Sequence, residues 1–449
     1  MKINKVAIAG SGITGLSTAY KLENFGVEVD VFEKNSEPGG AIKTVLNGEW
    51  MTEYGPNTIL LKDKIVSDFI RELGLHVDKQ EANTEAANRF IVRDGILEPL
   101  PTSFFALIGT SLFDIQAKLN VFKEPFISKS RNPDQTVAEF AERRLGEEIL
   151  DYAINPFIAG IFANKPENLS LRHALPAMHR LEQEYGSLAW GALSGSKKRK
   201  EEGRIPRELI SFKEGLQQLP KKIASRLNRV LYDKRVEKIE KKEAGWFISA
   251  NDQEFGPYEK VIVNIPLYFW TDQLLPIQNR VLAVLQDVNY PPLSVYHLGF
   301  MKEQIGHPLN GFGFLVPEKE NRNILGALFP TTLFNGRAPD GYHLLTVFAG
   351  GGRQPDLASM ETQKLYNIVK KDLEELIGIK EDPVYFDHVY WPRSIPSYHV
   401  GYDKILDTFQ KIEMQNPGLH IAGNFRNGVS VPDCIKNGIS LAEKISGEL

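Results

Sequence analysis

The chain has 449 residues, a formal net charge of −4 and charged residues of both signs, which is enough length for two or three domains with a large buried core. The slightly acidic balance and the lack of a long basic run exclude nucleic acid as an expected partner. Cys434 is the only cysteine, so no internal disulfide can form and we expect a reducing, cytoplasmic location.

The first residues read directly as a strand, which leaves no room for a signal peptide, and no apolar run reaches the ~18 residues of a membrane-spanning helix. The nine histidines show no metal-ligand spacing, so we expect no metal site. The chain also lacks a Gly-x-Ser-x-Gly nucleophile elbow and a Walker loop. The chemistry must therefore come from a bound cofactor.

The first forty residues carry the most informative pattern in the chain. Val6–Gly10 predicts a buried strand, a helical stretch follows it, and Val27–Phe32 predicts a second strand that ends at Glu33. Between the first strand and the helix lie the three glycines of a Gly-x-Gly-x-x-Gly turn, Gly10, Gly12 and Gly15. Strand, glycine turn, helix, second strand and acid together form the dinucleotide fingerprint.

Each part of this fingerprint has a physical role toward a nucleotide. The first glycine makes the tight turn, the second lets a pyrophosphate approach the backbone, and the third lets the helix pack closely on the strand. The free N–H groups at the helix N-terminus face the phosphates, and the acid binds the ribose hydroxyls. The residues assigned to the cofactor here are Gly10, Ser11, Gly12, Ile13, Thr14, Gly15, Glu33 and Lys34.

A second glycine pair, Gly39-Gly40, follows the acid and gives the backbone another close approach to the cofactor. With it the chain resembles the FAD-containing amine oxidase and desaturase superfamily, which implies that the nucleotide is FAD. That superfamily usually has arginine after the pair, whereas this chain has Ala41. The turn Gly55-Pro56-Asn57 resembles the superfamily's turn beside the flavin ring, although a plain turn is the alternative.

The next segments predict a hairpin and a helical region. Asp94-Gly95 lies between two apolar runs within 88–100 and predicts a hairpin, with Arg89 at its start. Residues 101–207 are mostly helical in pattern, and Thr136-Val-Ala-Glu139 is a capping box that starts a helix. The apolar stretch 103–113 fits either a core helix or a surface that dips into a bilayer. The charged, Gly/Ser-containing stretch 182–207 predicts a loosely ordered connection.

The second half predicts a return to the nucleotide fold and then a β-rich region. Strands are expected between 229 and 266, with Val236 either beside the adenine or in the core. Further strands between 291 and 399 are crossed by a helix over 362–377. Gly423-Asn424 ends a strand just before the final helix and offers a third backbone site for the flavin.

Several later stretches together resemble the protoporphyrinogen oxidase family. They are Asn155–Phe162, Ser211–Pro220, Gly311–Pro317, Leu325–Phe329, Leu333–Pro339, Trp391–Gly401 and Gly423–Gly438. The resemblance covers nearly the whole chain in order. It implies hydride transfer from a porphyrinogen to FAD in three two-electron rounds, without a strong protein base.

The resemblance also implies roles for single residues. Asn57 is expected to face the reacting ring and Arg89 to pair with a propionate, for which the bidentate guanidinium is suited. Phe329 and Phe348 are either apolar pocket walls or core residues. Further cofactor contacts, besides Gly39, Gly40, Gly55 and Pro56, are expected from Trp391, Gly423, Asn424, Val429, Ser430 and Val431.

We therefore predict an α/β (α+β) protein with a Rossmann-like FAD-binding domain built from discontinuous segments. This domain comprises 1–80, 208–268 and 410–449. A β-sheet substrate domain comprises 81–100 and 269–409. Residues 101–207 form a helical insertion, and membrane association of this insertion is one hypothesis.

The predicted function is FAD-dependent oxidation of protoporphyrinogen IX to protoporphyrin IX in haem synthesis. The alternatives are the same chemistry on coproporphyrinogen III, an amine oxidase or carotenoid desaturase, and a non-catalytic flavin-fold binding protein. Expected partners are the porphyrinogen, oxygen or another electron acceptor, and a membrane surface on the inner face of the cell. A homodimer is a further hypothesis.

Overall fold

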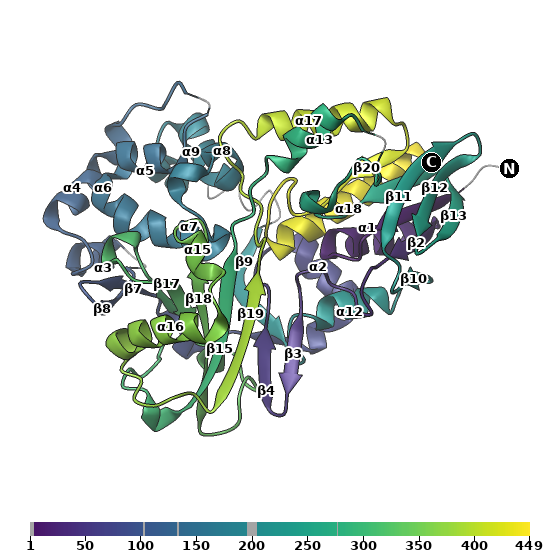
Figure 1. Cartoon of the computed structure of the whole chain (residues 1–449). Helices are drawn as coiled ribbons and strands as arrows, with labels where there is room; N and C mark the ends of the chain where they lie inside the picture. The colour runs from purple at the N-terminus through teal and green to yellow at the C-terminus, as the bar shows by residue number, and fades with distance from the viewer. Residues whose placement is uncertain (1–3, 102–103, 133, 195–203, 276) are drawn as a thin grey trace.

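Three regions make up the molecule in the computed structural model (Figure 1). A parallel sheet with its helices lies at the right of the view, a seven-stranded sheet lies below, and a group of helices lies at the left. The structure describes residues 4–101, 104–132, 134–194, 204–275 and 277–449.

The parallel sheet has five strands drawn from four distant parts of the chain. Their order is β10 (Val230–Leu231), β2 (Glu28–Phe32), β1 (Lys5–Ala9), β14 (Lys260–Val263) and β20 (Leu419–Ile421). All four pairings are parallel, and β1 lies in the centre with every residue from Val6 to Ala9 fully buried. Continuous burial on both faces explains why these strands read as unbroken apolar runs.

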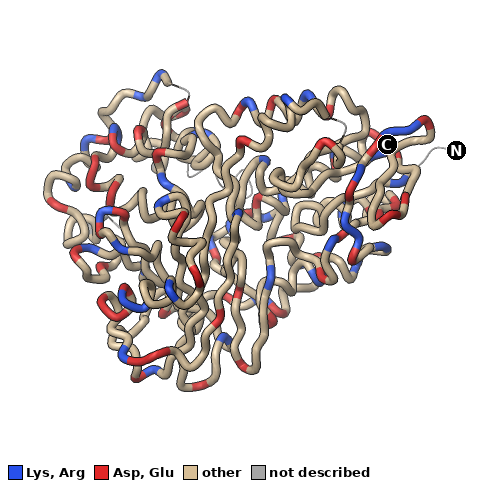
Figure 2. Tube along the Cα trace, in the orientation of Figure 1, with Lys and Arg blue, Asp and Glu red and all other residues tan. Residues whose placement is uncertain are grey.

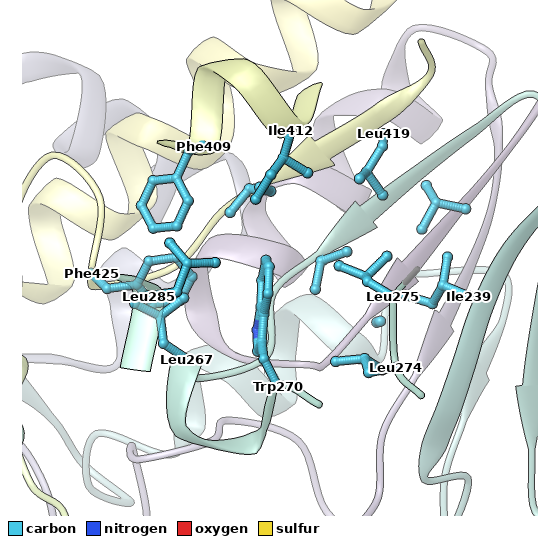
Figure 3. Close-up of a cluster of buried hydrophobic side chains, with 14 of the residues drawn as sticks. Ile239, Leu267, Trp270, Leu274, Leu275, Leu285, Phe409, Ile412, Leu419 and Phe425 are labelled. Atoms are coloured by element: carbon cyan, nitrogen blue, oxygen red, sulfur yellow. The ribbon is translucent and has the colours of Figure 1, made fainter. Parts of the chain in front are cut away.

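Two helices, α1 (Ile13–Asn24) and α18 (Val431–Glu448), pack side by side against this sheet (Figure 1). The opposite face carries the core drawn in Figure 3, where Trp270, Leu285 and Phe409 meet. Leu285 comes from α13 (Asn279–Gln286) and Phe409 from α17 (Asp403–Gln415), so two helices cover that face.

The smaller sheets extend this region. One contains β11 (Val236–Lys242), β12 (Gly245–Ala250) and β13 (Gln253–Tyr258), another contains β5 (Ile59–Asp63), β9 (Arg204–Phe212) and β6 (Lys79–Glu81), and a hairpin joins β3 (Thr44–Asn47) to β4 (Trp50–Glu53). The helices α2 (Lys64–Glu72) and α12 (Gln218–Ala224) pack beside them.

The seven-stranded sheet is the second large layer. Its order is β19 (Tyr385–Trp391), β15 (Leu293–Met301), β18 (Tyr342–Gly350), β17 (Ile324–Leu328), β16 (Gly313–Leu315), β7 (Phe90–Arg93) and β8 (Ile96–Pro99). The helix α16 (Thr362–Ile377) covers one face, as predicted to the residue at both ends. The predicted hairpin is confirmed, because Asp94 and Gly95 both have positive φ between β7 and β8.

The helical insertion contains α3 (Phe104–Gly109), α4 (Ile115–Lys123), α5 (Val137–Leu145), α6 (Glu147–Ile149), α7 (Asn155–Phe162), α8 (Leu171–Ala174), α9 (Pro176–Tyr185) and α10 (Leu188–Ser194). The predicted capping box of α5 is confirmed, with Thr136 and Glu139 bonded reciprocally. In the stretch 103–113, Leu112 and Phe113 are buried and Ile108 is exposed, while residues 102–103 lie outside the described residues.

The prediction of a loose connection over 182–207 is wrong for its helical first half and for residues 204–207, which begin β9. Residues 182–185 end α9 and residues 188–194 form α10, and Glu182 is fully buried where it binds both Arg143 and Arg144. Arg144 also binds Glu124, so one buried ion network joins three helical segments. Residues 195–203 lie outside the described residues.

The predicted fold class is confirmed, because a nucleotide-type parallel sheet, an antiparallel sheet and a helical insertion are all present. None of the helices in the described part of the chain is long and apolar enough to cross a membrane.

Candidate active site

The carboxyl ends of the parallel strands collect the residues that the fingerprint predicted. Gly10 follows β1, Glu33 follows β2, Asn264 follows β14 and Gly423 follows β20. Since neighbouring parallel strands end at the same edge, these residues share one edge of the sheet, which is where open α/β sheets bind ligands.

The glycine turn leads directly into an uncapped helix. Gly12 is the N-cap of α1, and none of the side chains that the structure describes caps the first N–H groups of the helix. These groups, including those of Ile13 and Thr14, are therefore available for a phosphate at the positive end of the helix. Glu33 lies beside the turn, where its carboxylate accepts hydrogen bonds from Ser11 N and Oγ at 3.1 and 2.5 Å.

Close packing explains why the third glycine is needed. A Cβ on Gly15 would lie 2.6 Å from Asn264 Nδ2 and 2.6 Å from the carbonyl oxygen of Gly10. Asn264 itself donates to that carbonyl at 3.1 Å, so it ties the end of β14 to the turn. Sequence analysis missed Asn264, although its place at the end of a predicted strand was a usable signal.

The second glycine pair lies against the first. Gly39 N donates to the carbonyl of Ser11 at 3.0 Å, and Gly39 and Gly12 form a parallel bridge. Lys34 is exposed nearby, with its ammonium 4.3 Å from the ring centre of Phe269. The two glycine motifs therefore form one continuous backbone surface.

The turn Gly55-Pro56-Asn57 packs on the residue after that pair. A Cβ on Gly55 would lie 1.9 Å from the carbonyl oxygen of Ala41, so only glycine fits there. The indole of Trp391 donates to the carbonyl of Tyr54 at 3.0 Å, which fixes the turn from the side of the seven-stranded sheet. Trp391 thus acts on the turn, and its contact with a flavin stays a prediction.

The C-terminal residues complete the same edge. Gly423 and Asn424 follow β20, and the Asn424 carbonyl accepts a hydrogen bond from Tyr398 at 2.8 Å. Ser430 is the N-cap of α18, and its hydroxyl accepts from Asp433 N. Its neighbours Val429 and Val431 pack into hydrophobic clusters and are half-buried and buried, respectively.

Val236 begins β11 and is half-buried against the core of the parallel sheet. Two residues earlier, Lys234 N donates to the carbonyl of Glu33 at 2.8 Å. Val236 therefore lies near the acid that is expected to bind the ribose, while its side chain also contributes to the core.

This donor set fits FAD. The uncapped α1 N-terminus suits a pyrophosphate, Glu33 suits ribose hydroxyls, and the Gly55 turn leaves backbone groups for the ring. Cys434, by contrast, is a buried thiol whose pKa burial raises to about 12, so it packs rather than reacts.

A small cavity opens next to the Gly55 turn. It is lined by Met51, Glu53, Asn57, Pro330, Leu333, Phe334, Arg337 and Thr346. Asn57 Nδ2 donates to the carbonyl of Gly55 at 3.1 Å, which holds its amide at the cavity.

Two buried charged groups of this cavity, Glu53 and Arg337, were not found by sequence analysis. Burial raises the pKa of Glu53 to about 7, against the lowering effect of bonds from Leu216 N and Thr44 Oγ1 and of the Arg337 charge. Burial also lowers the pKa of Arg337, whose guanidinium is 3.9 Å from Glu53 and bonded to Ser211 Oγ. The side chains of Glu53 and Arg337 are therefore both buried and hydrogen-bonded to other protein groups.

The predicted substrate residues fall on different parts of the seven-stranded sheet. Phe348 is half-buried on β18 and packs near Trp391, on the face that meets the Gly55 turn. Phe329 is 0% exposed and packs on Phe314 in the core against α16. Of the two readings of Phe329, the structure supports core packing, because the residue lies past the end of β17 and its ring enters the far-side core.

Arg89 is exposed just before β7, with its guanidinium 5.3 Å from the ring centre of Phe312. No carboxylate among the described residues pairs with it. Its propionate-binding role stays a prediction that this exposed position permits.

The described residues contain no group of His, Cys, Asp or Glu that could hold a metal ion.

Comparison with known proteins gives matches that extend over nearly the whole chain. The model of the flavin-containing amine oxidoreductases matches residues 13–446. The chain belongs to this family. It is an FAD-dependent oxidoreductase, in agreement with the nucleotide edge described above.

Individual relatives are similar over their full lengths. Protoporphyrinogen oxidase 2 of Arabidopsis thaliana is 33% identical, with 98% of this chain and 93% of that protein covered. Coproporphyrinogen III oxidase of Staphylococcus aureus is 26% identical, with 99% of each covered. A crystal structure of a candidate protoporphyrinogen oxidase from Exiguobacterium sp. 255-15 has a TM-score of 0.83 at 23% identity and full coverage of both chains, which shows the shared fold.

We predict that Gly15→Ala weakens FAD binding by at least about tenfold, because the new methyl group would push α1 away from the turn. The measurement is the flavin content of the purified protein and its titration with FAD. Gly447→Ala is the control, since a Cβ there meets nothing within 4 Å. Equal flavin content in both variants would contradict the assignment of the turn.

We predict that ionisation of the Glu53 carboxyl lowers the free energy of unfolding of the protein as the pH rises. Its folded pKa of about 7 lies above its ordinary value of 4.5, so between these values the unfolded chain releases the proton first and unfolding becomes easier. Glu53→Gln should therefore gain up to about 3 kcal/mol over the wild type from about pH 5 to about pH 8. Denaturant unfolding at both pH values measures this difference.

Glu49→Gln, in the exposed turn of the same hairpin, is the matched control and should follow the wild type at both pH values. A Glu53→Gln variant with the pH dependence of the wild type would show that the Glu53 carboxyl is not perturbed.

Proposed function

We propose that this protein oxidises a porphyrinogen to the corresponding porphyrin, with protoporphyrinogen IX as its substrate, in haem synthesis. The observation that carries this proposal is the 33% identity to a protoporphyrinogen oxidase over 98% of the chain, with both the nucleotide edge and the substrate-side sheet included. Coproporphyrinogen III is the second candidate, because a coproporphyrinogen III oxidase matches 99% of the chain at 26% identity.

The basic residues near the site favour the substrate with fewer carboxylates. Protoporphyrinogen carries two propionates and coproporphyrinogen four. Arg337 is buried and Arg353 is half-buried, and both are bonded to protein groups, Arg353 to the carbonyls of Val316 and Asn155. Arg89 is exposed and has no carboxylate partner among the described residues, so its guanidinium is free to bind a propionate.

FAD, when bound, supplies the two-electron acceptor for hydride from a bridge C–H bond, and oxygen or another acceptor then takes the electrons. The protein itself contributes by orienting the reacting groups and by keeping water away from them. Trp391 and Asn57 fix the turn beside the ring, while Phe348 and its apolar neighbours Val295 and Val389 keep water from the adjacent sheet face.

The deciding experiment mixes the FAD-loaded enzyme with each reduced porphyrinogen in air and follows porphyrin fluorescence. We expect kcat/KM to be about tenfold higher for protoporphyrinogen IX than for coproporphyrinogen III, since Arg89 is the one cation assigned to a propionate here and coproporphyrinogen carries two propionates more. The reverse order would move the assignment to coproporphyrinogen. If the protein binds flavin but forms porphyrin from neither substrate, the amine oxidase or carotenoid desaturase alternative remains. If the protein binds no flavin, the non-catalytic binding protein remains.

We predict that Arg89→Ala raises KM for the porphyrinogen about tenfold, because it removes one charge-assisted hydrogen-bonded pair. The flavin content and kcat should change little. Arg89→Lys keeps the charge without the bidentate geometry, so its KM should lie between those of the wild type and Arg89→Ala. Steady-state kinetics and flavin absorbance make the measurement, and loss of flavin in Arg89→Ala would show that the residue belongs to the cofactor site instead.

We also propose a peripheral position on the inner, cytoplasmic face of the cell membrane. Four apolar side chains at and beyond α4 are exposed at helical spacing, with Ile115 at 77% and Phe126 at 88%, and Leu119 and Phe122 between them. Lys123 and Lys129 are exposed within three residues of Phe122 or Phe126 in the sequence, and their charge suits anionic headgroups. Elsewhere both signs of charge are interspersed along the chain (Figure 2).

We predict that Phe122→Asp with Phe126→Asp lowers binding to vesicles of phosphatidylglycerol and phosphatidylcholine by at least about tenfold, because two large apolar groups leave the interface. Co-sedimentation measures the bound fraction. Met414→Asp, an exposed apolar residue of α17, is the control and should bind as the wild type does. Equal binding of all three proteins would remove the membrane proposal.

The homodimer stays a prediction, which sedimentation equilibrium tests.

A further inference from the structure

One polar row crosses the sheet face that meets the Gly55 turn. Asp387 on β19, His297 on β15 and Thr346 on β18 are direct cross-strand partners. Such partners point to the same face of a sheet. The neighbouring row on one side consists of Val389, Val295 and Phe348, so the polar row is isolated among apolar residues.

Contacts within the row are specific. The His297 ring is 0% exposed, and its Nδ1 is 3.2 Å from Thr346 Oγ1. Tyr54, the residue before Gly55, stacks on this ring with 5.8 Å between ring centres and 12° between planes. Burial, with a smaller contribution from the Asp387 carboxylate, raises the pKa of the Tyr54 phenol, and the stacked Tyr54 ring covers the row from the cofactor side.

The two ends of the row have different surroundings. Thr346 lines the cavity that Asn57 also lines. Asp387 is half-exposed and lies on β19, which is the edge strand of the sheet. The row therefore leads from the cavity beside the expected flavin ring to the outer edge of the protein.

The middle of the row has two free polar atoms. His297 Nε2 and Asp387 Oδ2 are buried without a hydrogen-bond partner in the described part of the chain. Buried polar atoms of this kind are normally satisfied, and two of them on neighbouring strands suit one bridging water. Burial, with a smaller contribution from His388, lowers the pKa of His297 to about 3, so the ring is neutral and has one donor and one acceptor nitrogen.

We propose that Thr346, His297 and Asp387 form a proton relay from the Asn57 cavity to the solvent. This role rests on the porphyrinogen oxidation proposed above. In each two-electron round a bridge C–H hydrogen leaves with its electron pair as hydride, and one proton is released as well. Over the three rounds these protons come from two pyrrole N–H bonds and from one further bridge C–H bond, one proton in each round. That proton passes through Thr346 Oγ1 to His297 Nδ1, while the proton on Nε2 leaves toward Asp387 and then to bulk water.

The test uses His297→Gln, which keeps hydrogen bonding but cannot exchange tautomers, and Thr346→Val, which removes only the hydroxyl. His388→Gln is the matched control. His388 lies next to Asp387 in β19 but faces α16, where both of its ring nitrogens are bonded, to Thr362 Oγ1 and Ser294 Oγ.

The measurement is the rate of flavin reduction by porphyrinogen in anaerobic single-turnover mixing, in water and in deuterium oxide. We expect a fall of about tenfold to a hundredfold in His297→Gln and Thr346→Val, with a larger solvent isotope effect and unchanged flavin content. The control variant should match the wild type. A purely structural role would not change the solvent isotope effect.

Wild-type rates and isotope effects in both relay variants would overturn the relay and leave the proposed function intact. A wild-type enzyme that oxidises neither porphyrinogen would remove the proposed function and, with it, this role of the row. A high-resolution crystal structure of the FAD-loaded enzyme gives a readout besides activity. A water that bridges His297 Nε2 and Asp387 Oδ2 is expected, and a dry gap between these atoms would overturn the relay.

Discussion

The free N–H groups at the start of α1 are the interaction on which the site depends. They lie at the carboxyl edge of a parallel sheet, uncapped by any side chain, and offer a pyrophosphate several donors and the positive end of the helix. The surrounding backbone is shaped to the same purpose. The Gly39-Gly40 pair bonds to the glycine turn, Asn264 ties β14 to it, and α18 from the end of the chain packs beside α1. Segments far apart in sequence must meet there before the cofactor can bind.

The second dependence is the contact between this edge and the seven-stranded sheet. Trp391 holds the Tyr54 carbonyl, and the Tyr54 ring covers His297. A flavin ring beside the Gly55 turn would therefore face a sheet whose surface is apolar except for one polar row. Such a surface would exclude water from a hydride donor, and its polar row is the path that we propose for the proton.

Local chemistry made much of the fold predictable from sequence. The glycine fingerprint, Asp94-Gly95 and the Thr136 cap each require one local geometry, and the periodicity of 362–377 marks its helix. The errors came from tertiary contacts. Charged Glu182 read as a surface residue, but two arginines from α5 bury it. No element was expected over 403–415, where α17 covers the parallel sheet. His297 gave no signal, because its role follows from strand register alone.

The central claim is that one FAD lies along this edge with its ring against the Gly55 turn. The most direct measurement is a crystal structure of the protein with its native flavin. We predict the pyrophosphate over the α1 N-terminus, the ribose on Glu33 and the ring between Asn57 and the sheet face that carries Thr346 and Phe348. A ring bound elsewhere, or a nucleotide edge filled by protein side chains, would contradict the account.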